Sequence, residues 1–246
     1  GWGRAGCLVD SGDGRVRFAR RGGWQGRSIA AVDFDDPQFV ERCLAIIEAE
    51  DFQGVTLASV SKGWRAERLS HVLARIRLPV LQIETLSQMG RLSIAYAQPK
   101  QLGVDRFLAL LAASEEAQPC AIISFGSAIT LDVLDVDGLH RGGLIAPSPE
   151  FQWSSMQDRF PGLFEGRGQA GLLADNTLDA LATGIEHQVL GMVDRVMLQA
   201  FGRRDVRLWV TGGGAENWLE RLPPGREHAP EILFSGMVRY IELSGL

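Results

Sequence analysis

The sequence has few cysteines, no long hydrophobic run and no block of basic residues, and each absence excludes a class of protein. Its three cysteines, Cys7, Cys43 and Cys120, are an odd number without metal-binding spacing, so we expect reduced thiols that act as small buried apolar groups. No apolar stretch approaches the roughly 20 residues that a membrane-spanning helix needs. The net charge is −5 without a sustained Lys/Arg block, which disfavours a nucleic-acid-binding surface.

Several familiar catalytic patterns are also missing. There is no phosphate-binding P-loop and no nucleophile elbow. The four histidines share no ligand spacing, so we do not expect zinc chemistry at His71, His140, His187 or His228. Three acidic residues flank a turn without a calcium-loop pattern, and we expect a solvated hairpin at Asp132, Asp135 and Asp137. The first residues lack the hydrophobic segment of a signal peptide, which favours a cytoplasmic protein.

The residues that are present indicate an α/β protein. The 246 residues are 46% hydrophobic and 22% charged, which suits one or two globular domains. Apolar periodicity predicts helices over residues 37–50, 64–76, 104–114 and 177–198, a short helix from residue 218, and a helix or strand–helix pair over 233–241. Strands are predicted over residues 7–9, 16–19, 54–60, 79–83, 120–126, 128–136, 139–145 and 207–210, and an exposed loop over 161–171.

One pattern occurs twice along the chain. An apolar strand, a glycine turn and a return strand appear near residue 8 and again near residue 122. Further strands and helices follow each copy. Two α/β halves that each present a glycine hairpin can form a cleft in which backbone N–H groups bind the phosphates of a nucleotide.

Two glycine turns are candidate phosphate loops. In the first, Asp10–Arg15 (DSGDGR), an aspartate at a strand end can hold Mg²⁺ while the turn amides approach phosphate. In the second, Gly126–Thr130 (GSAIT), small residues permit close approach and hydroxyl groups can donate to phosphate oxygens. An ordinary surface hairpin would show the same residue types in either place.

Two further strings lie at the start of predicted helices. Thr211–Gly214 (TGGG) follows an apolar strand, where open α/β sheets bind ligands, although three glycines also suit a tight strand–helix joint. Asp105 begins an apolar helix after Gly103. It is either a bland helix-start residue or a general base, with Arg106 beside it to hold a carboxylate or phosphate.

The four strings occur in an order that resembles type III pantothenate kinases, members of the actin and sugar-kinase ATPase superfamily. The resemblance covers nearly the whole chain, and its most diagnostic part is Tyr96 to Leu111. It continues through the segments Gly142–Pro147, Asn176–Thr177 with Gly184, and Thr211–Gly214. It implies two actin/ribonuclease H-like domains, residues 1–113 with the first phosphate loop and 114–246 with the second, and a nucleotide cleft between them.

The resemblance also implies an activity, its cofactors and a homodimer. The reaction would be phosphorylation of pantothenate by ATP, the first step of coenzyme A synthesis, with Mg²⁺ and a monovalent cation, K⁺ or ammonium. Asp105 would be the base. The pantothenate site would comprise Tyr96, Gly103, Val104, Asp105, Arg106 and Thr177. ATP would be bound by Asp10, Ser11, Gly12, Asp13, Gly14, Arg15, Val16, Arg17, Ser127, Gly212 and Gly213, with Mg²⁺ at Asp10 and the monovalent cation at Ser124. Neither nucleic acid nor a membrane would be a partner.

The chain departs from the family pattern in both phosphate loops. The first loop of the family usually has asparagine, a hydroxyl residue and lysine where this chain has Asp13, Gly14 and Arg17. Asp13 adds negative charge where phosphates are expected, unless a metal or Arg15 compensates. Ser124 stands where the family usually has an aspartate, and a neutral hydroxyl is a weaker cation ligand. Ser148 stands where glycine is common.

Three functional hypotheses follow. The first is an active pantothenate kinase. The second is a catalytically impaired relative that binds nucleotide or pantothenate or has a regulatory role, which the altered loops motivate. The third is a kinase for another small hydroxyl substrate, against which the retained Tyr96 and the Asp105–Arg106 pair argue.

Overall fold

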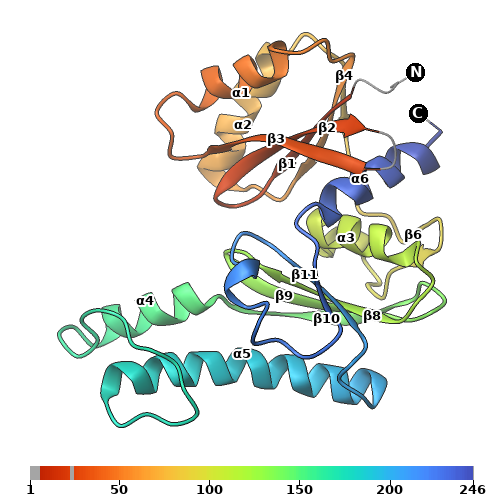
Figure 1. The fold of residues 1–246 in the computed structure, drawn as a ribbon. Coiled ribbons are helices and arrows are strands. Elements are labelled where there is room, and N and C mark those ends of the chain that lie inside the picture. The colour runs from red at the N-terminus through yellow and green to blue at the C-terminus, as the bar shows by residue number, and fades with distance from the viewer. Residues whose placement is uncertain (1–5, 23–24, 246) are drawn as a thin grey trace. The chain divides into compact units, whose positions relative to one another are not determined.

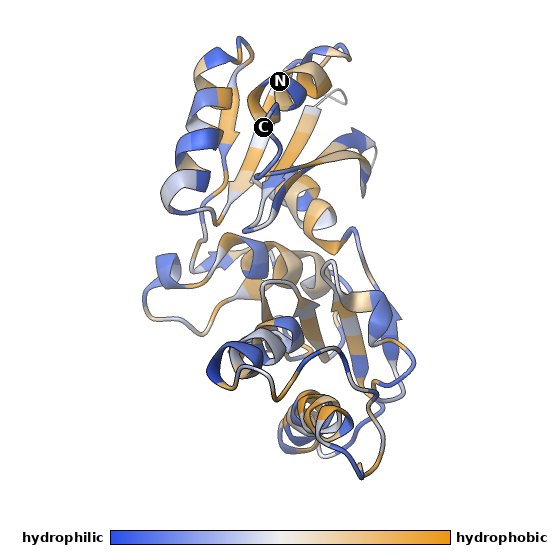
Figure 2. Cartoon of the chain, turned by 90° about the vertical axis from the view of Figure 1, so that its left-hand side faces the viewer, coloured by the Kyte–Doolittle hydropathy of each residue, from blue (hydrophilic) through white to orange (hydrophobic). Residues whose placement is uncertain are grey.

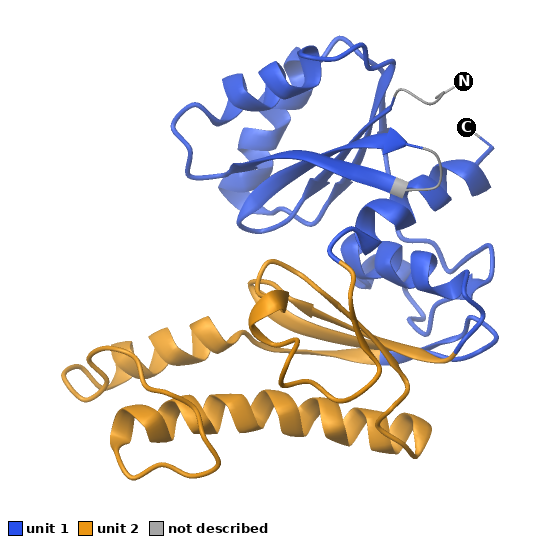
Figure 3. Cartoon of the chain, in the orientation of Figure 1, with its two compact units in different colours: residues 1–118, 134–142, 230–246 blue, residues 119–133, 143–229 orange. Residues whose placement is uncertain are grey.

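The computed structural model describes residues 6–22 and 25–245, which form two compact units (Figures 1 and 3). The first unit contains the described residues up to 118, together with residues 134–142 and the C-terminal segment from residue 230. The second contains residues 119–133 and 143–229. The expected domains, residues 1–113 and 114–246, divide the chain at one point. In the structure, residues 134–142 and the segment from residue 230 also belong to the first unit.

The first unit is built on a five-stranded sheet with the order β3-β2-β1-β4-β5. β1 pairs antiparallel with β2, and β2 with β3, whereas β1 pairs parallel with β4, and β4 with β5. The antiparallel part contains the predicted first hairpin and a third strand that was not predicted. The strands are β1 (Gly6–Ser11), β2 (Arg15–Gly22), β3 (Gln25–Asp33), β4 (Gly54–Ser59) and β5 (Val80–Gln82).

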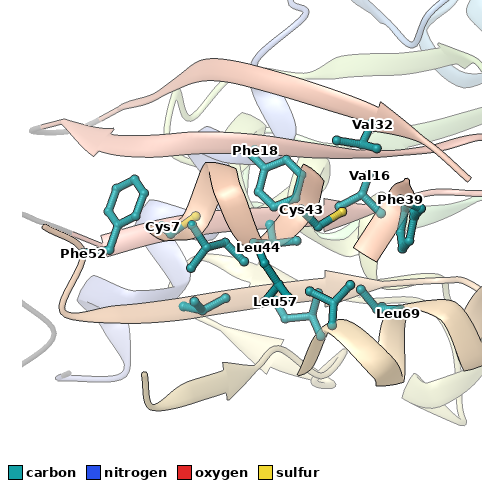
Figure 4. Packing of buried hydrophobic residues seen from close by; sticks show 14 of the residues in the cluster. Cys7, Val16, Phe18, Val32, Phe39, Cys43, Leu44, Phe52, Leu57 and Leu69 are labelled. Carbon is teal, nitrogen blue, oxygen red and sulfur yellow. The ribbon is translucent and has the colours of Figure 1, made fainter. Parts of the chain in front are cut away.

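One face of this sheet is covered by α1 (Phe39–Glu48) and α2 (Gly63–Arg75). Alternate strand residues such as Cys7, Phe18 and Leu57 form one apolar core with both helices, as Figure 4 shows. Apolar residues are concentrated on these strands in Figure 2. The period of two along a strand explains why their neighbours face the other way.

The neighbours of these core residues face α6 (Ile232–Leu243), which packs against β1 and β3. α3 (Val104–Ser114) packs along α6. A Cβ at Gly236 would overlap the backbone of Leu108, so glycine permits this close helix pair. Two short strands, β6 (Gln88–Met89) and β7 (Leu92–Ser93), and a 3₁₀ turn, η1 (Pro99–Gln101), precede α3. The C-terminal segment is therefore a helix throughout, without the strand that one prediction allowed.

The second unit repeats the topology of the first. Its sheet has the order β10-β9-β8-β11-β12, in which the strands stand in the same relative chain order as in the first sheet. The predicted internal duplication is thus confirmed at the level of topology. The strands are β8 (Cys120–Phe125), β9 (Ala128–Leu134), β10 (His140–Pro147), β11 (Arg207–Thr211) and β12 (Arg226–His228).

Two helices belong to this unit. α5 (Thr177–Phe201) places Val189, Val193 and Met197 in the core beneath the sheet, and it ends at Gly202 in the left-handed conformation. α4 (Pro149–Arg159) was not predicted, because its apolar residues are too few to show a helical period. In the part of the chain that the structure describes, no helix is long and apolar enough to cross a membrane.

Two local predictions are wrong. The short helix expected from residue 218 is instead a 3₁₀ turn, η2 (Ala215–Asn217), because Trp218 turns inward and stacks on Phe125. Asp132 is not solvated but only 3% exposed within β9. Asp135 behaves as expected of a turn residue, since its Oδ1 accepts hydrogen bonds from the backbone N–H groups of Asp137 and Leu139.

Candidate active site

Asp10 lies at the end of β1 on the face turned toward α6. It is 7% exposed, and its Oδ2 accepts hydrogen bonds from Arg17 Nε at 2.9 Å and Arg17 Nη2 at 2.8 Å. The two residues stand directly opposite each other in β1 and β2, so their side chains share a face. Burial raises the pKa of Asp10 above its ordinary value, and the Arg17 guanidinium opposes this shift.

Arg17 is itself held by the C-terminal segment. Its Nη1 donates to the carbonyl oxygen of Pro230 at 3.3 Å, and its guanidinium lies 5.0 Å from the ring centre of Phe234. Arg17 therefore connects α6 to the carboxylate of Asp10, whereas the resemblance implied a role toward ATP.

The first glycine turn is exposed at its tip and braced at its base. Gly12 N–H donates to the carbonyl oxygen of Arg15 at 3.2 Å, and Asp13, Gly14 and Arg15 are exposed, whereas Val16 points into the core. The Ser11 and Ser61 hydroxyls are 2.7 Å apart, and the Ser61 hydroxyl donates to the Gly12 carbonyl at 2.9 Å.

Arg15 does not neutralise the charge of Asp13, because it pairs with another carboxylate. Its ion pair is with Asp33 at the end of β3, at 3.3 Å. Both partners are largely exposed, so this pair contributes little to stability. The added negative charge of Asp13 therefore stays in the turn where phosphate is expected.

Asp105 occupies the first turn of α3, where the helix dipole favours a carboxylate. Burial raises its pKa, the charge of Asp10 raises it further, and a hydrogen bond from the Arg106 backbone N–H lowers it. The charge of Asp10 therefore acts on Asp105, although the two residues lie 95 positions apart in the sequence. A Cβ at Gly103 would collide with the Asp105 carboxyl group, so this glycine accommodates the side chain of the candidate base.

Tyr96 and Arg106 meet beside Asp105. Arg106 is 7% exposed, its Nη1 donates to Tyr96 Oη at 3.3 Å, and its guanidinium lies 5.8 Å from the Tyr96 ring centre. Tyr96 is half-buried, and Val104 is buried at the start of α3. A buried guanidinium beside a phenol suits an anionic or hydrogen-bond-accepting ligand.

The second unit brings together its own glycine loops. Gly214 N–H donates to the carbonyl oxygen of Phe125 at 3.0 Å, which joins the TGGG string to the turn that contains Ser127. Gly212 has φ +90°, and a Cβ there would lie 2.6 Å from Phe125 N. Only glycine fits this position. Gly213 and Ser127 are exposed, and a Cβ at Gly213 would meet nothing within 4 Å.

Two further predicted residues belong to the second unit. Ser124 is the penultimate residue of β8 and lies opposite Thr211 of β11. Phe125 separates it from the glycine turn. Thr177 is exposed at the start of α5, next to Asn176, whose side chain accepts a hydrogen bond from Asp179 N–H as the helix N-cap.

The structure adds three supporting residues that the sequence patterns missed. Ser61 braces the first turn, and Thr85 Oγ1 donates to the carbonyl oxygen of Leu102, just before Gly103, at 2.9 Å. His140 is 1% exposed and stacks on Tyr96, with ring centres 6.1 Å apart and planes at 13°. Each of the three lies at or beyond a strand end, where site residues of α/β proteins are expected. None belongs to a recognisable sequence motif.

The site residues fit a metal that is held mainly by its nucleotide. Among the described residues, no group of three or more His, Cys, Asp or Glu side chains could hold a metal ion. Mg²⁺ commonly binds through one or two carboxylates together with substrate phosphates, so Asp10 alone is compatible with it.

Comparisons with known proteins point to one family. A family model described as type III pantothenate kinase matches residues 8–199. The type III pantothenate kinase of Stenotrophomonas maltophilia (strain K279a) is 36% identical over 160 residues, which span 64% of this chain and 65% of that relative. The type III pantothenate kinase of Xanthomonas campestris pv. campestris (strain B100) is 34% identical over 231 residues, which span 92% and 93% of the two chains.

Two solved structures share the fold. A protein from Campylobacter jejuni, provisionally assigned to the Baf family of transcriptional activators, has a TM-score of 0.66 and 18% identity over 97% of this chain and 98% of its own. A protein from Sinorhizobium meliloti, provisionally assigned as a 2-dehydro-3-deoxygalactonokinase, has a TM-score of 0.60 and 14% identity over 98% and 99%. With the duplicated topology, these likenesses confirm the predicted fold class of actin-like α/β halves.

Proposed function

Because this chain belongs to the type III pantothenate kinase family, we propose that it transfers the γ-phosphoryl group of ATP to the hydroxyl group of pantothenate. The product, 4′-phosphopantothenate, is the first intermediate of coenzyme A synthesis. The observation that carries the proposal is the pairing of a partly buried carboxylate of raised pKa, Asp105, with the Tyr96–Arg106 contact at one end of α3.

Asp105 is the general base. Phosphoryl transfer depends on positioning and charge neutralisation more than on covalent chemistry, so the protein must orient the attacking hydroxyl group and accept its proton. A carboxylate whose pKa lies above the ordinary range is a better proton acceptor than an exposed one. Burial and the charge of Asp10 both raise the pKa of Asp105.

Pantothenate lies against the start of α3. Arg106 supplies a fixed positive charge for its carboxylate, and Tyr96 supplies a partly exposed aromatic surface. Gly103 accommodates the carboxyl group of Asp105, Val104 holds the first helical turn in the core, and Thr177 is a further candidate contact of pantothenate.

ATP is bound through two backbone-rich turns. Residues 10–17 form the first turn. Ser127, Gly212 and Gly213 belong to the second, and backbone N–H groups of such glycine turns can meet phosphate oxygens. Asp10 would hold Mg²⁺, which neutralises the charge of the phosphates during transfer. Ser124 would contact the monovalent cation, K⁺ or ammonium, more weakly than the carboxylate common in the family.

The remaining parts of the proposal concern assembly and setting. The resemblance to the family leads us to expect a homodimer, and we place the enzyme in the cytoplasm. The three cysteines are buried thiols, which suits a reducing compartment.

Turnover with purified protein tests the proposal. The assay measures ADP formation with pantothenate, ATP, Mg²⁺ and K⁺, for the wild type, Asp105→Asn and the control Glu41→Gln. Glu41 is also an acidic residue in a first helical turn, but it is exposed and lies in α1. We expect turnover by the wild type and the control. Pantothenate binding without any wild-type turnover would instead support the impaired relative, and turnover only with another hydroxyl substrate would support the third hypothesis.

A further inference from the structure

His140 is the buried histidine that the proposed mechanism does not use. It lies at the start of β10, in the segment of residues 134–142 that belongs to the first unit. Its ring is nearly parallel to that of Tyr96, at 13°, with 6.1 Å between the ring centres. It is 1% exposed, whereas Tyr96 is only half-buried. The histidine thus supports the tyrosine from the protein interior.

The imidazole also contacts the backbone beside Tyr96. The N–H group of Ala95 donates to His140 Nδ1 at 3.4 Å. One side chain therefore touches both the ring of Tyr96 and the peptide group that precedes it.

The hairpin that carries His140 is itself anchored on the strand leading to Tyr96. Ser93 N–H donates to the carbonyl oxygen of Gly138 at 3.0 Å, and Arg91 Nη2 donates to the carbonyl oxygen of Val136 at 3.1 Å. Gly138 has φ +84°, and a Cβ there would lie 2.9 Å from the Arg91 carbonyl carbon. The hairpin tip and residues 91–95 are therefore in close backbone contact.

We infer that His140 is a positioning residue for the pantothenate subsite. It fixes the ring of Tyr96, and Arg106 is held against that ring. The inference rests on the proposed function. Arg106 reaches Tyr96 both through the phenol oxygen and across the ring face. A tyrosine free to rotate would release one support of that guanidinium, and the position of the positive charge would become less defined.

Three substitutions separate the two contacts of His140. His140→Phe keeps an aromatic ring for stacking but loses the acceptor for Ala95. His140→Gln keeps an acceptor but loses the ring, and His140→Ala loses both. Val136→Ala is the matched control, because that side chain belongs to the same hairpin and is 50% exposed.

Steady-state kinetics with the full chain tests the inference. For His140→Ala we expect the KM for pantothenate to rise about three- to tenfold, the range that typical aromatic contacts imply. The KM for ATP should stay within about twofold, because the inferred role of His140 is confined to the pantothenate subsite. His140→Phe should restore most of the loss, His140→Gln little of it, and Val136→Ala should match the wild type. Calorimetric titration with pantothenate alone should reproduce the order of affinities without turnover.

The outcomes distinguish the inference from the proposed function. If the wild type lacks turnover, the proposed function fails, while the titration still measures the subsite. If His140→Ala does not fold, the comparison of His140→Phe with His140→Gln decides alone. The inference is overturned if both of these variants bind pantothenate as the wild type does. It is also overturned if the KM values for both substrates rise together, since that pattern indicates a general loss of structure.

Discussion

Replacing Asp105 by asparagine is the sharpest test of the catalytic assignment. The amide keeps the size of the side chain and fits beside Gly103, but it cannot accept the substrate proton. General-base catalysis typically accounts for 10²–10⁴-fold in rate, so we expect kcat to fall by that order, which is about 3–5 kcal/mol in the barrier. The KM for pantothenate should change little, because Arg106 and Tyr96 remain in place.

The pH dependence follows from the same carboxylate. Asp105 acts as a base only when ionised, and its pKa is raised by burial and by the charge of Asp10. Wild-type kcat/KM should therefore fall as the pH decreases through a value above the ordinary aspartate range. The slow residual rate of Asp105→Asn should lack this acidic limb.

Stability should move in the opposite direction to activity. A carboxyl group with a raised pKa in the folded state favours folding at low pH, and this contribution is lost as the pH rises through that pKa. The asparagine variant lacks an ionised buried group, so its melting temperature should exceed that of the wild type at neutral pH. The difference should vanish toward pH values below the unfolded pKa, about 4. A variant with wild-type kcat, or one less stable than the wild type at neutral pH, would refute the assignment.

Four further substitutions test the phosphate turns and the buried ion pair. Gly212→Ala should raise the KM for ATP and lower the melting temperature, whereas Gly213→Ala, at an open position, should leave the melting temperature unchanged; equal losses of stability would contradict the geometry. Ser124→Asp should lower the K⁺ concentration needed for half-maximal activity, and an unchanged K⁺ dependence would place the cation elsewhere. Arg17→Met should destabilise the protein by up to about 3–5 kcal/mol in urea denaturation at pH 7 with EDTA, because it leaves the Asp10 carboxylate buried without its partner; a loss under about 1 kcal/mol would show that the pair contributes only as much as an exposed one.

The helices and strands with strong periodicity could be predicted from the sequence. The predicted helix over residues 104–114 coincides with α3. Its eleven residues are mostly apolar, follow a glycine and include an acidic residue in the first turn. α4 escaped prediction, since its apolar residues Phe151, Trp153 and Met156 form no stripe and only Trp153 is buried. β3 escaped because glycine, arginine and serine interrupt its alternation.

The strings of the candidate site could also be found, but not the residues that support them. Asp105 and Gly212 stand in recognisable motifs, and local chemistry explains both. His140 meets Tyr96 across 43 intervening positions only because a hairpin of the second sheet ends on the strand before Tyr96. A lone histidine without ligand spacing carries no signal of such a contact, since tertiary packing alone creates it.

Arg17 shows how a departure from a family pattern acquires a physical meaning. Read as a sequence, the arginine replaces a lysine near phosphate. In the folded chain its Nε and Nη2 both reach one oxygen of Asp10, while its planar face lies over Phe234. A lysine offers a single point charge and cannot make these contacts together. Any Mg²⁺ that binds Asp10 must therefore share the carboxylate with Arg17. The arginine offsets the buried negative charge of Asp10 and also competes with Mg²⁺ for the same group. Calorimetric titration of the nucleotide-free protein should then show weaker Mg²⁺ binding by the wild type than by Arg17→Lys, and equal affinities would mean that Arg17 does not compete for the carboxylate.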